Sequence, residues 1–204
     1  MNDLFSRGYL TLFKIKGVPI RAHWSVPLVC LAFSRFRFEP GLWVGILVVI
    51  LLHELGHAFL VWRMGLVNLG IDLTGFGGLC RWTGHPTEIQ RAGIAWGGVL
   101  AQLALFVVAT VVLLVVGEPT HPWLRQLVEA FTTANLFIAA FNLVPIRPFD
   151  GGEAWPLFRH LWRRRQARRK WKKKLVKADD DDGDDPLSQT LRQALADADR
   201  KKKS

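Results

Sequence analysis

An apolar run at residues 43–62, WVGILVVILLHELGHAFLVW, contains three ionisable side chains within five residues. As a helix this run is long enough to cross a bilayer, because about 20 residues rising 1.5 Å each cover the hydrocarbon core. An ionisable side chain at the bilayer centre costs about 2.5–3.5 kcal/mol on insertion scales. We therefore expect His53, Glu54 and His57 to serve a ligand or a reaction that offsets this cost.

Four segments are apolar enough to enter a membrane. They are residues 23–34, which are short for a span, and residues 41–62, 92–116 and 123–144. Residues 66–86 are rich in glycine and other turn-forming residues, which predicts a β-hairpin or a loop. We expect an all-α polytopic membrane protein with about four transmembrane helices and a small β-hairpin on the cytoplasmic side.

Positive charge is concentrated near the C-terminal end. Residues 1–158 hold 11 Lys and Arg against 9 Asp and Glu, whereas residues 159–204 hold 16 against 8. We interpret residues 1–158 as a membrane-embedded domain and residues 159–204 as a basic and acidic tail. Basic segments next to apolar spans stay on the cytoplasmic side, so the chain is predicted to be a multi-pass integral membrane protein with a cytoplasmic tail.

The basic block at residues 159–177 favours a partner of opposite charge. Anionic lipids are the predicted partner, because each basic residue near a membrane surface contributes about 1 kcal/mol of attraction. A retention or topology signal without a partner is the alternative. The six aspartates of residues 179–185 are placed to compete with lipid for this block. No nucleic-acid-binding motif accompanies the basic residues, so we predict no nucleic-acid partner.

Two further features concern the cell compartment. Cys30 and Cys80 form no C-x-x-C pattern, and we predict unpaired thiols. Residues 1–20 carry basic residues without an uninterrupted apolar core, so we expect no signal peptide.

The H-E-x-x-H spacing predicts a metal site. His53 and His57 are four residues apart, so a helix points both imidazoles to one side. Zinc suits this pair, and with three protein ligands it keeps one position open for water. Glu54 lies about 100° further around the helix, where it can reach that water without being a ligand. The third ligand should be acidic and at the same depth; Asp150, just after the fourth span, is preferred and Asp72 is the other candidate.

The chain resembles the site-2 protease family of intramembrane zinc metalloproteases. Three stretches carry the resemblance: GVPIRAHWS, HELGH and NLVPIRPFDGG, the last of which is similar to the pattern N-x-x-P-x-x-x-x-D-G. The resemblance implies one Zn²⁺ per chain, held by His53, His57 and Asp150, with Glu54 as the catalytic acid and base. It also implies a core of three helices, formed here by the second to fourth spans, in a compact prokaryotic type without PDZ or CBS domains.

The resemblance also implies substrate-binding residues, through motifs that are less specific. Gly77 and Gly78 resemble a glycine-containing hairpin that receives extended substrate, and an ordinary turn is the alternative. Asn142 and Pro145 are implied to bind substrate, with Asn142 near the oxyanion; a helix cap or backbone hydrogen bond is the alternative for Asn142. The third span has Gly-Val and Gln102 where the family often has Gly-Pro and a later Asn, so the resemblance assigns that span no polar role.

The predicted function is hydrolysis of peptide bonds in membrane-spanning proteins, which is regulated intramembrane proteolysis. The resemblance implies a single-span membrane protein as substrate and the prokaryotic inner (cell) membrane as location. A non-catalytic membrane scaffold or a zinc-binding chaperone of the same fold is the alternative. Glu54 favours the enzyme, because a scaffold needs no base at that position. The sequence sets no oligomeric state.

Overall fold

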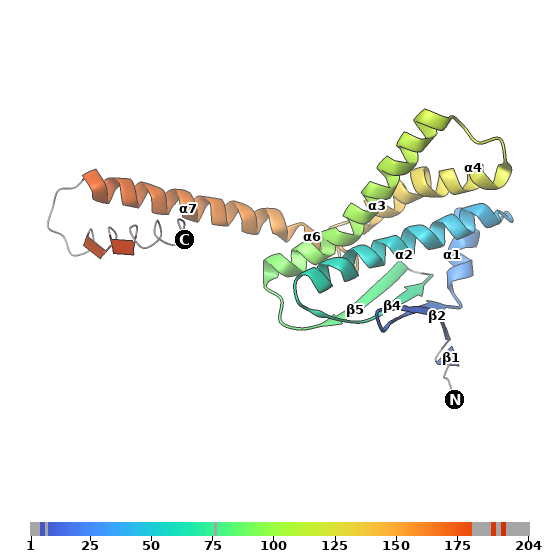
Figure 1. Cartoon of the computed structure of the whole chain (residues 1–204), viewed down its shortest axis with the longest axis horizontal. Helices are drawn as coiled ribbons and strands as arrows, with labels where there is room; N and C mark the ends of the chain where they lie inside the picture. The colour runs from blue at the N-terminus through green and yellow to red at the C-terminus, as the bar shows by residue number, and fades with distance from the viewer. Residues whose placement is uncertain (1–4, 7, 76, 181–188, 191–192, 195–204) are drawn as a thin grey trace. The chain divides into compact units, whose positions relative to one another are not determined.

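A computed structural model describes residues 5–6, 8–75, 77–180, 189–190 and 193–194, and the chain forms two compact units, residues 1–157 and 158–204. The elements are, in order, β1 (Phe5–Ser6), β2 (Tyr9–Ile15), β3 (Val18–His23), α1 (Val26–Phe33), α2 (Pro40–Arg63), β4 (Val67–Thr74), β5 (Gly77–Thr83), α3 (Glu88–Val116), α4 (Pro122–Glu129), the π-helical turn η1 (Ala130–Ala134), α5 (Asn135–Asn142), α6 (Gly151–Ala154) and α7 (Pro156–Asp180) (Figure 1).

The strands form one five-stranded sheet in the order β1-β2-β3-β4-β5. The hairpin predicted at residues 66–86 is present as β4 and β5. The chain is mostly helical, as expected, but its sheet is larger than the predicted hairpin, because residues 8–22 add a second hairpin, β2 and β3. Its two-residue turn, Lys16-Gly17, has φ of 48° and 84°, the positive values that a type I′ hairpin turn requires. β3 and β4 join the two hairpins in parallel, with Ile20 opposite Ile71.

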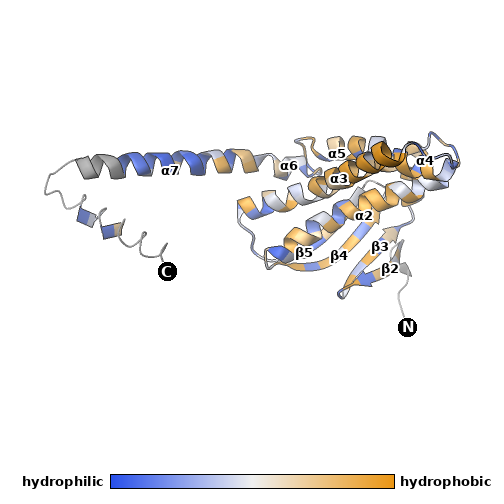
Figure 2. Cartoon of the chain, turned by 45° about the horizontal axis from the view of Figure 1, so that its top comes forward, coloured by the Kyte–Doolittle hydropathy of each residue, from blue (hydrophilic) through white to orange (hydrophobic). Residues whose placement is uncertain are grey.

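Among the described residues two helices, α2 and α3, are long and apolar enough to cross a membrane. They correspond to the second and third expected spans, and Figure 2 shows both coloured mostly as hydrophobic. The other two expected spans are less regular. Residues 23–34 give only α1, which has eight residues and is followed by Arg35 and Phe36 with φ of 50° and 62°. Residues 122–142 are helical throughout, because α4, the π turn and α5 follow one another directly and the residues at both junctions keep helical backbone angles.

Helix α2 lies between the sheet and α3 (Figure 1). Its sheet side packs Ile46 and Ile50 against Ile20, Ile71 and Leu73 in one buried cluster. Its α3 side approaches so closely that a Cβ placed on Gly56 would lie 2.3 Å from the carbonyl oxygen of Gly97. These two contacts bury the polar residues of α2 from both sides, which is the environment that the functional site requires.

Candidate metal centre and cleft

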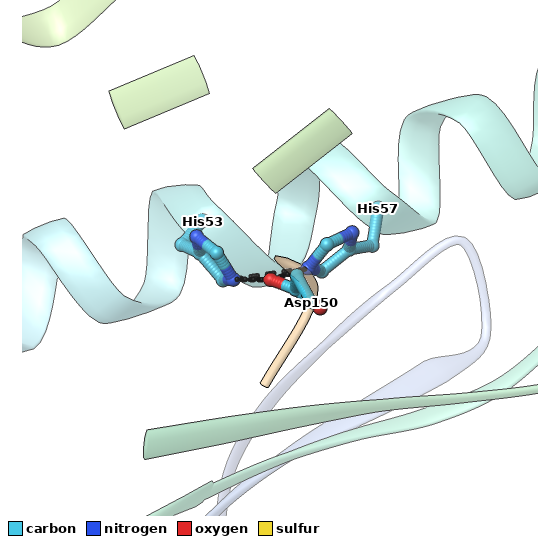
Figure 3. A group of neighbouring side chains, drawn as sticks. All are labelled: His53, His57 and Asp150. Carbon is cyan, nitrogen blue, oxygen red and sulfur yellow. Dashed lines mark hydrogen bonds and ion pairs between the residues drawn. The ribbon is translucent and has the colours of Figure 1, made fainter. Parts of the chain in front are cut away.

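His53, His57 and Asp150 converge on one point (Figure 3). The two histidines project from α2 and are 5% and 6% exposed, and Asp150 comes from the loop between α5 and α6. Asp150 Oδ2 lies 2.8 Å from His53 Nε2 and 3.2 Å from His57 Nε2. The two Nε2 atoms are 3.0 Å apart. Among the described residues, these three side chains are the group that could hold a metal ion.

The hydrogen bonds of the ring nitrogens decide what these atoms can bind. His57 Nδ1 lies 2.7 Å from the carbonyl oxygen of Ile94, which can only accept, so Nδ1 carries the proton. His53 Nδ1 lies 2.8 Å from Gln102 Oε1 in the same arrangement. Both Nε2 lone pairs therefore face the Asp150 carboxylate, and three electron-rich atoms this close repel unless a cation lies between them. Tetrahedral zinc with bonds of about 2.0–2.1 Å spaces its ligand atoms by about 3.3 Å, so the set suits zinc.

Asp150 has the charge that a ligand needs. Burial acts to raise the pKa of its carboxyl, whereas positive charge on His53 or His57, when either imidazole is protonated, lowers that pKa below its usual range. A metal cation held between the same side chains would favour the ionised carboxylate in the same way.

Glu54 lies beside the three residues without joining them. Its Oε1 is 4.0 Å from His53 Nε2, and the side chain is 3% exposed. It accepts a hydrogen bond from the backbone of Cys80 in β5. A Cβ on Gly78 would lie 2.2 Å from Glu54 Oε1, so β5 passes directly over the carboxylate and a larger residue at this position would displace it. The arrangement suits a base that serves the metal site from its edge.

A cleft of about 1130 Å³ opens onto these residues. Its walls come from α1, α2, the β4–β5 hairpin, α3, α5, α6 and the loop between α5 and α6. The lining includes the three possible metal ligands, Glu54, and the predicted substrate residues Asn142, Gly77 and Gly78. Pro145 is exposed and does not line the cleft. Much of the wall is apolar, including Val29, Phe33, Ile50, Leu79, Phe137, Ile138 and Phe141.

Asn142 lies against a metal-site histidine. Its Nδ2 is 3.4 Å from both ring nitrogens of His53, so it packs on the ring instead of donating along one lone pair. Asp72, the other candidate third ligand, lies elsewhere: it forms ion pairs with Arg21 at 2.7 Å and with Arg81 at 2.9 Å. Those pairs join β3, β4 and β5 side by side, so Asp72 stabilises the sheet.

The histidine of the N-terminal motif, His23, also has a structural position. Its Nδ1 lies 2.7 Å from Ser25 Oγ, which accepts a hydrogen bond from the backbone N–H of Gly75 at 2.8 Å. Because Gly75 also lines the cleft, these two side chains fix one end of the β4–β5 turn against the start of α1.

Two residues of α3 that the sequence left without a role contact the metal site. Gln102 is fully buried and bonds His53. A Cβ on Gly98 would lie 2.5 Å from His53 Cε1 and 2.6 Å from His57 Nε2. Gln102 could have been identified from the sequence as a functional residue, because it is a polar residue in an otherwise apolar helix. The signal for Gly98 was weaker, because helix packing alone also explains a Gly-Gly pair.

We expect Gly98→Ala to weaken zinc binding by about 10-fold or more, because the methyl group displaces both imidazoles. Zinc affinity is measured by competition with a chromophoric chelator on detergent-purified protein. Gly93→Ala is the matched control, because its Cβ would meet only the flexible end of Met64, at 3.3 Å. Unchanged zinc affinity in Gly98→Ala would show that the histidines tolerate the displacement.

Comparisons with known proteins agree with this geometry. A scan of protein-family models finds no match. The chain is 32% identical over 155 residues to the zinc metalloprotease MJ0392 of Methanocaldococcus jannaschii, covering 70% of this chain and 43% of that protein. It is 29% identical over 178 residues to the putative zinc metalloprotease Rip3 of Mycobacterium tuberculosis, covering 78% of this chain and 45% of Rip3. The chain thus spans a little under half the length of these two relatives.

A solved structure extends the likeness to the fold. The site-2 protease from Methanocaldococcus jannaschii superposes with a TM-score of 0.57 at 28% identity, covering 74% of this chain and 71% of that one. Two helices able to cross a membrane, together with this homology, indicate an integral membrane protein. The chain is therefore a homologue of zinc metalloproteases of the site-2 protease family.

Proposed function

We propose that the chain hydrolyses peptide bonds of membrane-spanning proteins at one zinc centre formed by His53, His57 and Asp150. The observation that carries the proposal is the convergence of these three side chains beside the buried Glu54, at a cleft large enough for a peptide. Homology to zinc metalloproteases supports it.

The residues divide the chemistry between them. A zinc ion held there would polarise a substrate carbonyl and lower the pKa of a bound water. Glu54 takes the proton of the attacking water and passes it to the leaving amine nitrogen. The Asn142 amide is close enough to His53 to donate a hydrogen bond to the carbonyl oxygen as negative charge develops there.

The substrate binds as an added strand. A transmembrane helix hides its peptide carbonyls in its own hydrogen bonds, so the segment must unwind before it can react. β5 is the last strand in the sheet order, and its edge runs past Glu54. Gly77 has open space where a side chain would stand, and Gly78 lets β5 lie against Glu54, so the edge can pair with extended substrate close to the base. Pro145 shapes the loop that carries Asp150. Single-span membrane proteins are the substrates that this arrangement suits.

A non-catalytic scaffold or zinc-binding chaperone of the same fold is the alternative, and the burial of Glu54 counts against it. A carboxylate that is neither exposed nor a ligand is costly to bury, and a scaffold gains nothing from it.

The test uses the purified chain in liposomes with a single-span model substrate. We expect cleavage within the membrane segment, located by mass spectrometry of the products. A zinc chelator should stop cleavage, and added zinc should restore it. A chain that binds zinc but cleaves no tested single-span substrate would favour the scaffold.

We also propose that the C-terminal unit lies on the cytoplasmic face of a prokaryotic inner membrane and binds anionic lipids. α7 carries the basic block, and the described side chains of residues 161–174 are exposed. Figure 2 shows most of α7 coloured as hydrophilic. The acidic stretch at residues 179–185 lies mostly outside the described residues.

Trypsin should cleave the basic block several-fold more slowly in nanodiscs of anionic lipid than in zwitterionic nanodiscs, because lipid covers its Lys and Arg side chains. High salt should remove the difference, since it screens the attraction. Deleting residues 179–185 should slow cleavage further in the anionic nanodiscs alone. Equal cleavage rates in both lipids would exclude anionic lipid as the partner.

A further inference from the structure

The amide of Gln102 determines which nitrogen of His53 faces the metal site. Gln102 projects from α3 and is fully buried, and its Oε1 lies 2.8 Å from His53 Nδ1. An amide oxygen can only accept, so it keeps the proton of His53 on Nδ1 and leaves the Nε2 lone pair for a metal ion. Without that acceptor the imidazole can carry its proton on either nitrogen or turn in its pocket.

Gln102 is costly to bury for any other purpose. Among the described residues its Nε2 has no hydrogen-bond partner, although the atom is buried. A side chain that served only to fill space here would be apolar and would leave no donor unsatisfied. The oxygen, and not the volume, accounts for glutamine at this position.

The backbone of Gln102 is itself held by the π-helical turn. In that turn the backbone N–H of Asn135 bonds the carbonyls of Ala130 and Thr132, so the carbonyl of Phe131 lacks its usual helical partner. Asn135 Nδ2 bonds the Phe131 carbonyl at 3.1 Å and the Gln102 carbonyl at 2.8 Å. Both acceptors are carbonyls, which fixes the orientation of the Asn135 amide. The π turn therefore aims Asn135 at α3.

α5 contacts both the metal site and the helix that supports it. Asn135 and Asn142 are seven residues apart, which places them on one side of the helix about two turns apart. Asn135 bonds the backbone of α3, and Asn142 packs on the ring of His53. His53 is thus held by Gln102 on one side and Asn142 on another, and Asn135 fixes α3 and α5 to each other.

We propose that Gln102 is a positioning residue for the metal site, which holds His53 as an Nε2 ligand, and that Asn135 in turn positions Gln102 through the π turn. The inference rests on the zinc centre of the proposed function. It gives α3 a role in the metal site that the mostly apolar sequence of this helix does not indicate.

Zinc affinity of the purified full chain, measured by chelator competition, tests this. Gln102→Leu should bind zinc about 10–100-fold more weakly than wild type, as expected for loss of an outer partner of a ligand. Gln102→Glu retains an oxygen acceptor and should restore affinity to within a few-fold. Asn135→Asp removes both donated hydrogen bonds at constant size and should also weaken zinc binding. The visible spectrum of bound Co²⁺ should change in Gln102→Leu and Asn135→Asp, because the ligand geometry changes.

Gln126→Leu is the matched control. Gln126 Oε1 also accepts a hydrogen bond from α2, from the backbone N–H of Gly41 at 2.9 Å, but it lies outside the metal site. Its zinc affinity and Co²⁺ spectrum should equal those of wild type. The inference is overturned if Gln102→Leu binds zinc as wild type does, or if Gln102→Glu is as weak as Gln102→Leu. If Gln102→Leu does not fold, unchanged affinity in Asn135→Asp overturns it. Wild-type protein that binds no zinc overturns the proposed zinc centre itself.

Discussion

Replacing Glu54 by Gln should reduce peptide-bond cleavage by about 10²–10⁴-fold while zinc stays bound, because the amide cannot accept a proton. Glu54 is not among the three converging side chains, and its Oε1 lies 4.0 Å from His53 Nε2, so the substitution leaves the ligand set intact. The change is nearly isosteric, which matters because β5 leaves no spare room at Gly78. Cleavage of a single-span substrate in liposomes and zinc content per chain are measured on the same preparation.

Glu153→Gln is the control for this experiment. Glu153 also lines the cleft, but its carboxylate lies 3.9 Å from Arg91 and 3.7 Å from Arg147, away from the metal site. Its cleavage rate should stay within a few-fold of wild type. A cleavage rate in Glu54→Gln equal to wild type would exclude Glu54 as the base. Wild-type behaviour of Glu54→Gln in cells, together with lost cleavage, would instead favour the scaffold.

Replacing Asp150 by Ala should abolish zinc binding at micromolar metal and, with it, cleavage. Loss of an outer partner typically weakens binding by about 10–100-fold, and loss of a ligand should exceed that range. The two Nε2 atoms would keep their lone pairs, but the negative charge that offsets the cation would be gone. Zinc per chain after dialysis, measured by atomic emission, reports the result.

Asp72→Asn separates ligand loss from a general loss of stability. Asp72 is also a buried aspartate, and it is paired with Arg21 and Arg81 in the sheet. Removing its charge leaves those guanidinium groups without their partner and should lower thermal stability, yet the folded fraction should keep one zinc per chain. Zinc retained by Asp150→Ala and lost by Asp72→Asn would reverse the assignment of the third ligand.

The sequence predicted features that depend on local spacing. The four-residue interval between His53 and His57 fixes a common helix face, and the ring-to-ring distance follows from that interval. Asp150 lies nearly a hundred residues away, so its choice over Asp72 rested on depth and on the resemblance to a family. The turn at Lys16-Gly17 produces a second hairpin, which was not among the expected elements.

Longer-range features could not be predicted in this way. The parallel pairing of β3 with β4 joins residues about fifty positions apart, and no local pattern encodes it. The role of Gln102 depends on the rotation of α3 against α2, which is set by the contact of Gly56 with Gly97. The residues of the π turn, AFTTA, form no sequence pattern that predicts such a turn. The orientation that it gives to the Asn135 side chain is therefore visible only in the structure.

The pairing of β3 with β4 limits the number of times that the chain between these two strands can cross the bilayer. Both strands belong to one sheet, so the chain between them must cross an even number of times. If α2 makes one crossing, residues 24–39 make the other. The eight residues of α1 rise about 12 Å, and residues 34–39 can add at most about 20 Å when extended.

The combined length of α1 and residues 34–39 barely equals the thickness of a hydrocarbon core, about 30 Å. Arg35 and Phe36 have left-handed backbone angles, which shorten this segment further. A connection this short would hold the sheet close to the lipid headgroups on its side of the membrane. The exposed apolar side chains of β2, which are Leu10, Leu12, Phe13 and Ile15, would then contact lipid instead of water. β5, the strand proposed to accept substrate, would in that case lie within reach of a helix embedded in the bilayer.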